Sequence, residues 1–165
     1  METVNAIGPL DGRYARLTHE LADIFSESGL IRHRVLVEIQ WLKFILYDLK
    51  LTTVSTDPSA LDQILDQFGP TDVQQVKSIE KTTNHDVKAV EYYIKEKLDD
   101  LGLSEIREWV HFACTSEDIN NTAYALMTEK GRQLTAELMG RCIQEIGQKA
   151  KTYQSIPMMS RTHGQ

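Results

Sequence analysis

The absence of proline between Thr115 and Pro157 constrains the fold of this chain more than any other feature. Proline removes a backbone donor and breaks helices, so its absence permits one unbroken helix. Apolar residues recur through this stretch at helical spacing. They are Ile119, Ala123, Leu126, Leu134, Leu138, Cys142, Ile146, Ala150 and Tyr153. At 3.6 residues per turn the stripe extends over about ten turns, which is typical of a bundle helix that crosses an assembly.

The sequence before this stretch also predicts helices. Residues 26–49 carry a wide apolar stripe, so we expect a helix with more than one buried face. Asp57 before Pro58 is a helix start, with the carboxylate as N-cap and proline in the first turn. We expect that helix to end at Gly69-Pro70.

Two capping patterns predict the next helices. Thr71 with Gln74 resembles a capping box, so a helix is expected from there to about Thr83. Thr83 with Asp86 is a similar signal, which predicts a further helix over residues 85–101.

The remaining breaks define the fold class. Gly102 is expected to stop the preceding helix, and a short helix is expected over residues 105–111. The chain is therefore predicted to be all-α. We expect a helical N-terminal domain over residues 1–114, followed over residues 115–165 by the first long helix of a second domain.

The composition excludes several classes of protein. A hydrophobic content of 41% and a charged content of 25% are ordinary for a soluble globular chain. The net charge of −6 argues against a protein that coats nucleic acid. The N-terminus lacks a signal-peptide layout, and no apolar run approaches the ~20 residues that span a bilayer. Cys114 and Cys142 form no CxxC pair, so we expect a cytoplasmic protein without a zinc site or contact with membranes.

Four short polar segments carry the candidate chemistry, and the first lies near the N-terminus. Arg13 offers a planar set of donors suited to phosphate, and Tyr14 adds a hydroxyl. The alternative is a surface turn with a solvated arginine.

The second segment lies between two predicted helices. It places His85 between Asn84 and Asp86 in a run of six polar residues. An imidazole can transfer a proton at neutral pH. The alternative is a capped turn, which accounts for Thr83 and Asp86 but leaves His85 without a role.

The third and fourth segments flank the long helix. Thr115 and Ser116 would lie at its positive end, where free N–H groups and hydroxyls suit a carboxylate or phosphate. A simple N-cap explains one of these hydroxyls better than both. In the fourth segment, glycine after His163 allows a ligand to approach the backbone closely.

Three other reactive side chains are interpreted as structural. Cys114 is expected to be a buried small residue, because no helix start or cation is aimed at it. His19 and His33 are expected on solvent-facing helix surfaces.

Taken together, the four segments resemble the adenylosuccinate lyase family, in the bacterial branch of the fumarase/aspartase superfamily. The resemblance covers essentially the whole chain, in order, and implies the fumarase/aspartase-like all-α fold, with the long helix as the first of a central bundle. The matching runs are Pro9-Leu10-Asp11-Gly12-Arg13-Tyr14, the twelve residues from Lys81 to Tyr92, the eleven from His111 to Asn121, and Ser160-Arg161-Thr162-His163-Gly164-Gln165.

The resemblance implies a β-elimination in purine biosynthesis, on the routes to AMP and IMP. Fumarate would leave from adenylosuccinate and from succinyl-aminoimidazole-carboxamide ribotide. A proton is lost beside a carboxylate, so the developing dianion needs preorganised donors. The departing nitrogen needs a general acid, and the phosphate needs cationic and N–H partners. No metal or organic cofactor is implied.

The resemblance also implies roles for single residues. His163 would be the general acid, and His85 would assist it or hold charged groups of the substrate. Asn84 and Asp86 would line the same pocket. The other implied substrate contacts are Arg13 and Tyr14 for the phosphate, Thr115 and Ser116 for a succinyl carboxylate, and Thr162.

Family members run to several hundred residues and form homotetramers whose active sites combine three subunits. Their serine base lies on a mobile loop that this sequence does not contain. We therefore expect this chain to be the N-terminal portion of a longer enzyme and to be inactive alone. We also expect it to self-associate through the apolar stripe of its long helix.

Two alternative functions stay open. Argininosuccinate lyase, aspartase and fumarase share the Thr-His-Gly motif, but not the Gly-Arg-Tyr segment that would bind phosphate. The chain could also be a stand-alone helical interaction module derived from a lyase. The intact chemistry at residues 84–86 and 162–164 argues against that reading.

Overall fold

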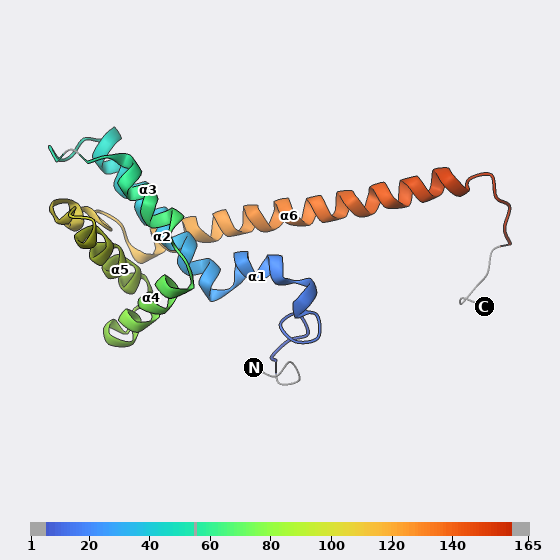
Figure 1. Cartoon of the computed structure of the whole chain (residues 1–165), viewed down its shortest axis with the longest axis horizontal. Helices are drawn as coiled ribbons and strands as arrows, with labels where there is room; N and C mark the ends of the chain where they lie inside the picture. The colour runs from blue at the N-terminus through green and yellow to red at the C-terminus, as the bar shows by residue number, and fades with distance from the viewer. Residues whose placement is uncertain (1–5, 55, 160–165) are drawn as a thin grey trace. The chain divides into compact units, whose positions relative to one another are not determined.

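The structure is a computed structural model that describes residues 6–54 and 56–159. Every regular element in these ranges is helical (Figure 1), which confirms the predicted fold class. The elements are the 3₁₀ turn η2 (Ala15–Leu17), α1 (His19–Phe25), α2 (Glu27–Lys43), the π-helical turn η3 (Phe44–Asp48), α3 (Pro58–Asp66), α4 (Pro70–Thr83), α5 (Asp86–Asp100), the 3₁₀ helix η4 (Ser104–Trp109) and α6 (Ser116–Tyr153).

Contacts divide the chain into two compact units, residues 1–129 and 130–165. The first unit holds all the elements up to η4 and the start of α6, and the second holds the rest of α6. The domain boundary proposed between residues 114 and 115 stays a prediction.

Helix α2 is the centre of the core in the first unit. It packs against α1, α3, α4 and α5. Its residues Val35, Ile39 and Leu42 are fully buried, and α5 contributes Tyr93 and Ile94 to the same cluster. Burying each large apolar side chain contributes about 1.5–3 kcal/mol, so this shared core holds α3, α4 and α5 to α2.

Two predicted helix boundaries are confirmed by their hydrogen bonds. The Asp57 carboxylate accepts from the Ser59 N–H at 2.9 Å, and Pro58 opens α3. At the end of α5, Gly102 adopts φ +72°, a left-handed conformation that glycine reaches without strain. The start of α2 also requires glycine, because a Cβ on Gly29 would lie 2.4 Å from the Ile24 carbonyl oxygen.

The predicted N-cap of α4 is wrong by two residues. The helix begins at Pro70, and Gly69 is its N-cap. The reciprocal partner is Asp72, whose carboxylate accepts from the Gly69 N–H at 2.9 Å. The Thr71–Gln74 pattern misled because it requires a side chain at the cap, and glycine has none. Gly69-Pro70 therefore opens α4, whereas α3 ends earlier, at Asp66.

The cap of α5 was also assigned to the wrong residue. Thr83 is the last residue of α4, and the N-cap of α5 is His85. Its Nδ1 accepts from the Lys88 N–H at 3.2 Å. His85 therefore has a structural role, contrary to the reasoning from sequence.

Two further expectations need correction. His33 is 2% exposed and its Nδ1 lies 2.7 Å from the Gly29 carbonyl oxygen, so it is a core residue and not a surface one. The short helix predicted over residues 105–111 is the 3₁₀ helix η4, which ends at Trp109. His19 is exposed, as expected.

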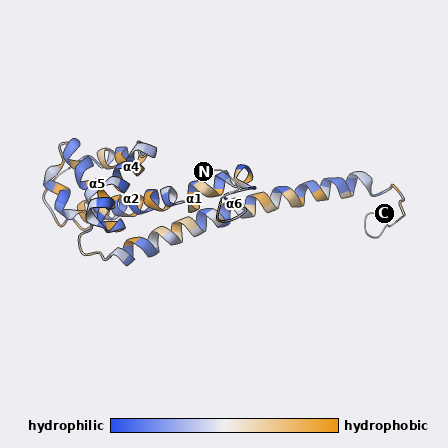
Figure 2. Ribbon diagram, turned by 90° about the horizontal axis from the view of Figure 1, so that it is seen from below, coloured by the Kyte–Doolittle hydropathy of each residue, from blue (hydrophilic) through white to orange (hydrophobic). Residues whose placement is uncertain are grey.

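Helix α6 changes character along its length. In the first unit it buries Ile119, Ala123 and Met127. In the second unit most of its large apolar side chains are exposed, with Ile143 and Ile146 above 60%. Hydrophobic residues recur along the whole ribbon (Figure 2), as the sequence stripe predicted. Within the described residues no helix is long and apolar enough to cross a membrane.

Candidate functional site

The α4–α5 corner presents the second polar segment. Asn84 ends α4 in the left-handed conformation, with φ 51°, and its N–H donates to the Glu80 carbonyl at 2.7 Å. This geometry turns the chain so that His85 and Asp86 follow at once. All three residues are exposed. The corner therefore offers three polar side chains to solvent on a fixed backbone.

The hydrogen bond of His85 fixes what its imidazole can offer. Nδ1 is the acceptor for the Lys88 N–H, so a neutral ring carries its proton on Nε2. About half of the side chain is exposed. In this state the open nitrogen can donate a hydrogen bond to an anion, but cannot accept a proton. Protonation would require Nδ1 to give up the cap.

Asp86 is bonded through both carboxylate oxygens. Oδ1 accepts from the Val87 N–H at 2.8 Å, and Oδ2 accepts from the Arg34 guanidinium at 2.6 Å. Burial raises the pKa of Asp86, but the Val87 hydrogen bond and the charge of Arg34 outweigh it and lower the pKa overall. The carboxylate is therefore charged and fixed at neutral pH.

The start of α6 presents the third polar segment. The Thr115 N–H and hydroxyl both donate to Asp118 Oδ2, at 2.7 and 3.0 Å. These hydrogen bonds lower the pKa of Asp118. Thr115 and Asp118 therefore pair at the start of the helix. Ser116, the first helical residue, has no described hydrogen bond from its hydroxyl, so the N-cap explains only one of the two hydroxyls.

The loop before α6 is held by two contacts with α2. The Trp41 indole N–H donates to the Phe112 carbonyl at 2.8 Å. His111 Nδ1 lies 2.6 Å from Glu38 Oε1, and the Glu38 side chain is fully buried. Burial raises the pKa of Glu38, opposed in part by His111. His111 and Ala113 both adopt positive φ, so these contacts hold a strained loop in place.

Cys114 is less buried than the sequence predicted. Its thiol is half-buried, and burial, with Glu38 and Asp118 nearby, raises its pKa to about 11. A thiol protonated at neutral pH is a poor nucleophile.

The Arg13–Tyr14 segment is exposed. The Arg13 guanidinium stacks 5.4 Å from the centre of the Tyr14 ring, and Tyr14 is 42% exposed. No described hydrogen bond or ion pair links either residue to the α4–α5 corner or to the start of α6. Thr162 and His163 lie outside the residues that the structure describes.

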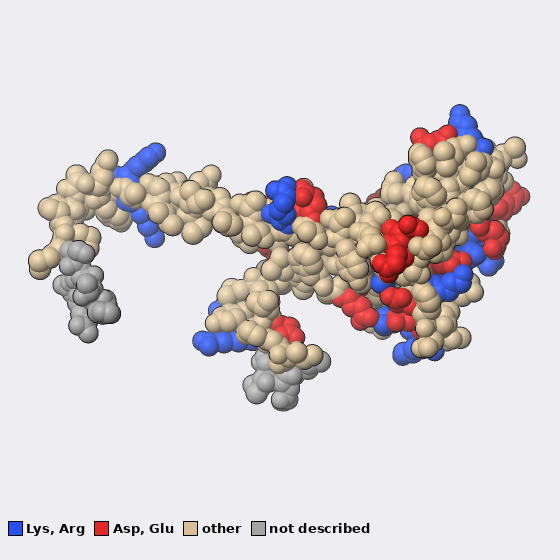
Figure 3. Space-filling view, turned by 180° about the vertical axis from the view of Figure 1, so that it is seen from behind, with Lys and Arg blue, Asp and Glu red and all other residues tan. Residues whose placement is uncertain are grey.

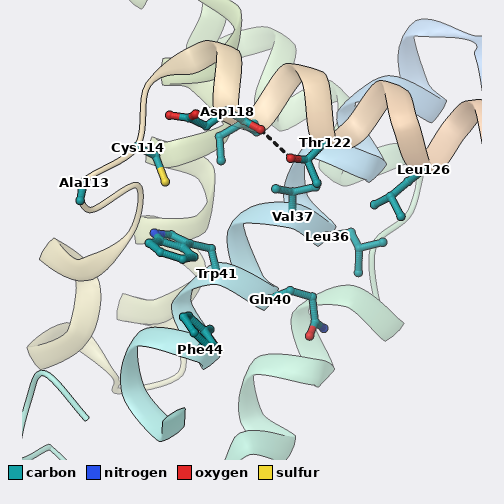
Figure 4. Close-up of a pocket in the computed structure, with 11 residues that line it drawn as sticks. Leu36, Val37, Gln40, Trp41, Phe44, Ala113, Cys114, Asp118, Thr122 and Leu126 are labelled. Carbon is teal, nitrogen blue, oxygen red and sulfur yellow. Dashed lines mark hydrogen bonds between the residues drawn. The ribbon is translucent and has the colours of Figure 1, made fainter. Parts of the chain in front are cut away.

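A groove of about 690 Å³ runs between α2, the 110–115 loop and the first turns of α6 (Figure 4). Trp41 and Phe44 stack on one wall, with ring centres 5.7 Å apart, and Cys114 points toward them. The lining is mainly apolar, and none of the predicted site residues contributes to it. The groove suits hydrophobic packing better than a charged nucleotide.

Charges of both signs lie close together over the first unit on the face shown in Figure 3. Among the described residues, no group of three or more His, Cys, Asp or Glu side chains could hold a metal ion.

Sequence reasoning missed Arg34 and Glu38, the two residues that connect the segments to the core. Arg34 is 5% exposed and Glu38 is 1% exposed. They lie four residues apart on α2, among Ile31, Val35 and Ile39. A charged pair on an otherwise apolar helix face was the signal in the sequence, because buried charges need partners.

Comparison of the sequence with known proteins shows the family of this chain. The family model described as Lyase matches residues 12–165. The chain belongs to this lyase family. It is 46% identical to adenylosuccinate lyase of Haemophilus influenzae, 43% to that of Vibrio cholerae and 42% to that of Escherichia coli K12.

Each of these alignments covers the whole chain but only 38% of the relative. The resemblance read from the polar segments is thereby confirmed at the level of the family.

Proposed function

We propose that this chain is the N-terminal part of an adenylosuccinate lyase, which releases fumarate by β-elimination from adenylosuccinate and from succinyl-aminoimidazole-carboxamide ribotide. The observation that carries the proposal is the identity of 42–46%, across the whole chain, to proteins of that name. Because the chain spans 38% of their length, the proposed activity is that of a protein containing this chain. We propose a cytoplasmic location for it.

The α4–α5 corner would hold the charged part of the substrate. The Nε2 donor of His85 suits a carboxylate or phosphate oxygen, whereas a neutral ring in this tautomer is unsuited to act as base. Asn84, in its left-handed conformation, would add an amide to the same pocket. These features favour the role of a binding and assisting residue for His85.

The start of α6 would bind a succinyl carboxylate. Helix N-termini attract anions, and the Ser116 hydroxyl is not used in the N-cap. Thr115 would contribute its N–H and its hydroxyl after exchange with Asp118, which accepts from both. Arg13 and Tyr14 would hold the phosphate, and Thr162 would contact the substrate. We propose His163 as the general acid.

A chimera tests the proposal with a complete protein. This chain replaces the segment of the Haemophilus influenzae relative that aligns with it, and fumarate release from adenylosuccinate is measured. We expect an active chimera, and loss of most activity with His163→Ala. The matched control is His19→Ala, because His19 is exposed and contacts only the Arg16 carbonyl. The chain alone is expected to release no fumarate.

The same assay addresses the alternatives. A folded chimera that acts on argininosuccinate but not on adenylosuccinate would favour another lyase of the superfamily. A folded chimera without activity toward either substrate would favour an interaction module. Activity unaffected by His163→Ala would refute the proposed general acid.

We also propose that the protein is a homo-oligomer in which α6 contributes an interface. Leu138, Ile143 and Ile146 are each 45–66% exposed, and exposed apolar stripes favour association. Light scattering at micromolar concentration should give a mass above 18.8 kDa for the chain. Ile143→Glu should lower that mass, whereas a monomeric unmodified chain would refute association through α6.

A further inference from the structure

One buried side chain joins two of the polar segments. The Arg34 guanidinium donates from Nη2 to Asp86 Oδ2 at 2.6 Å and from Nε to Asn120 Oδ1 at 2.9 Å. Asp86 is the first residue of α5, and Asn120 lies in the second turn of α6. All three residues belong to the first unit. The two segments therefore meet on a single planar group.

The geometry is specific to arginine. The guanidinium is planar, always charged, and directs several N–H groups in fixed directions. Arg34 is 5% exposed, so its charge needs partners. The Asp86 carboxylate neutralises the charge, and the Asn120 amide accepts a second N–H. A lysine at this position could reach one of these acceptors but would not orient both.

Each acceptor lies beside a proposed substrate contact. Asp86 immediately follows His85. Asn120 lies four residues after Ser116, and residues at this spacing share one helix face. Asn120 is itself held by Glu117, whose carboxylate accepts from Nδ2 at 3.2 Å. A shift of Arg34 would therefore be transmitted to both sides of the proposed substrate pocket.

We propose that Arg34 is a positioning residue that fixes the distance between the His85 corner and the start of α6, and that Asp86 acts through Arg34 rather than on the substrate. Both oxygens of Asp86 are already bonded, to Val87 and to Arg34. Direct binding of substrate by this carboxylate would require one of these bonds to break.

The predicted effects on kcat rest on the proposed function, because they require an active lyase. In the active protein that carries this chain, Arg34→Gln should lower kcat by about 10- to 100-fold, because displacements near 1 Å can cost that much. The kcat of Arg34→Lys should lie between that of Arg34→Gln and that of the unmodified enzyme. Arg32→Gln is the matched control, since Arg32 lies on the same helix but bonds the Phe68 carbonyl.

A double-mutant cycle separates positioning from direct binding. If Asp86 acts through Arg34, Asp86→Asn and Arg34→Gln should each lower kcat, and the double variant should be no worse than the more damaging single variant. If Asp86 binds substrate directly, Asp86→Asn should mainly raise KM, and the two effects should multiply. The second result would overturn the assignment of Asp86.

A measurement without substrate tests the contact itself. Arg34→Gln in the chain should raise the pKa of Asp86, measured by carbon NMR of the carboxyl group, because the charge of Arg34 lowers it. Amide hydrogen exchange should become faster both at residues 86–88 and at residues 116–120. Arg32→Gln should change neither quantity.

The outcomes are distinguishable. An unmodified protein that releases no fumarate refutes the proposed function, while the NMR and exchange results still decide whether Arg34 joins the segments. Unchanged exchange at one of the two segments overturns the inference. A kcat that stays at the unmodified value in a folded Arg34→Gln enzyme also overturns it, because a purely structural contact would lower only thermal stability.

Discussion

The two halves of α6 carry the same apolar periodicity but lie in different environments. Before residue 130 most of the stripe is buried, with Ile119 and Ala123 at 1% and 0% exposure, although Leu126 is 37% exposed. After it, Ile143 and Ile146 are 66% and 62% exposed. A repeating pattern therefore shows which face of a helix is apolar, but not what covers it. The first half belongs to the compact unit of residues 1–129, whereas the second half belongs to the unit of residues 130–165.

The largest predicted effect contrasts one residue from each half. Ile119→Ala should lower the free energy of unfolding by about 2–5 kcal/mol, because it removes buried methyl groups and leaves a cavity. Ile146→Ala should change it by less than about 0.5 kcal/mol when the chain is monomeric. Urea unfolding followed by circular dichroism at low protein concentration measures both. Equal losses would show that the two halves are equally buried.

The second prediction concerns Glu38, whose carboxyl group contacts His111 in the loop that precedes α6. Burial raises the pKa of Glu38 above its ordinary value of 4.5. The folded state therefore binds this proton more tightly than the unfolded state does. The contribution to stability is complete below pH 4.5 and is lost as the pH rises through the folded pKa.

Glu38→Gln removes this titration. Its stability relative to the unmodified chain should rise as the pH increases above 4.5. His111 and Glu91 are the charged groups that act on Glu38, so His111→Gln is a useful second variant. Thermal unfolding measured from pH 4 to pH 8 gives the comparison. A difference that falls with pH would contradict the predicted sign.

The third prediction tests the exposed half through a glycine. A Cβ at Gly140 would meet nothing within 4 Å. Gly140→Ala should therefore stabilise the helix by up to about 1 kcal/mol. Gly29→Ala is the opposite control, since its Cβ would clash with the Ile24 carbonyl. If Gly140→Ala instead weakens self-association in analytical ultracentrifugation, another helix packs closely against this glycine.

The smallest effect is expected at the start of the buried half. Hydrogen bonds from Thr115 lower the pKa of Asp118 below its ordinary value of 3.8. Its contribution to stability is present above pH 3.8 and is lost as the pH falls through the folded pKa. Asp118→Asn should therefore lower stability slightly at neutral pH and have little effect in strong acid, where the wild-type carboxyl group is also protonated. A larger loss in acid than at neutral pH would contradict this sign.

Local chemistry made much of the fold predictable. The N-cap Asp57 and the Thr115–Asp118 pair are contacts between near neighbours, so a sequence pattern contains both partners. The start of α4 was missed because its cap, Gly69, acts through its backbone alone. His33 was placed at the surface because it is polar, although the wide apolar stripe predicted more than one buried face on this helix.

The candidate site was predictable only in part, for a related reason. Residues 84–86 and 115–116 stand out as polar runs between apolar helices. Arg34 joins these two segments but does not stand out in the sequence, because it lies 52 positions from Asp86 and 86 positions from Asn120. A sequence pattern that repeats every few residues cannot detect contacts between residues so far apart in the chain.

These two separations also set the order in which the site forms during folding. The Arg34 hydrogen bonds require α2, α5 and α6 to have met, and closing long loops is entropically costly. Helices with local contacts form earlier than contacts of high sequence separation. The Arg34 hydrogen bonds are therefore expected to be absent from the folding transition state. Arg34→Gln should then accelerate unfolding and leave the folding rate unchanged, so the arginine would protect the native state kinetically.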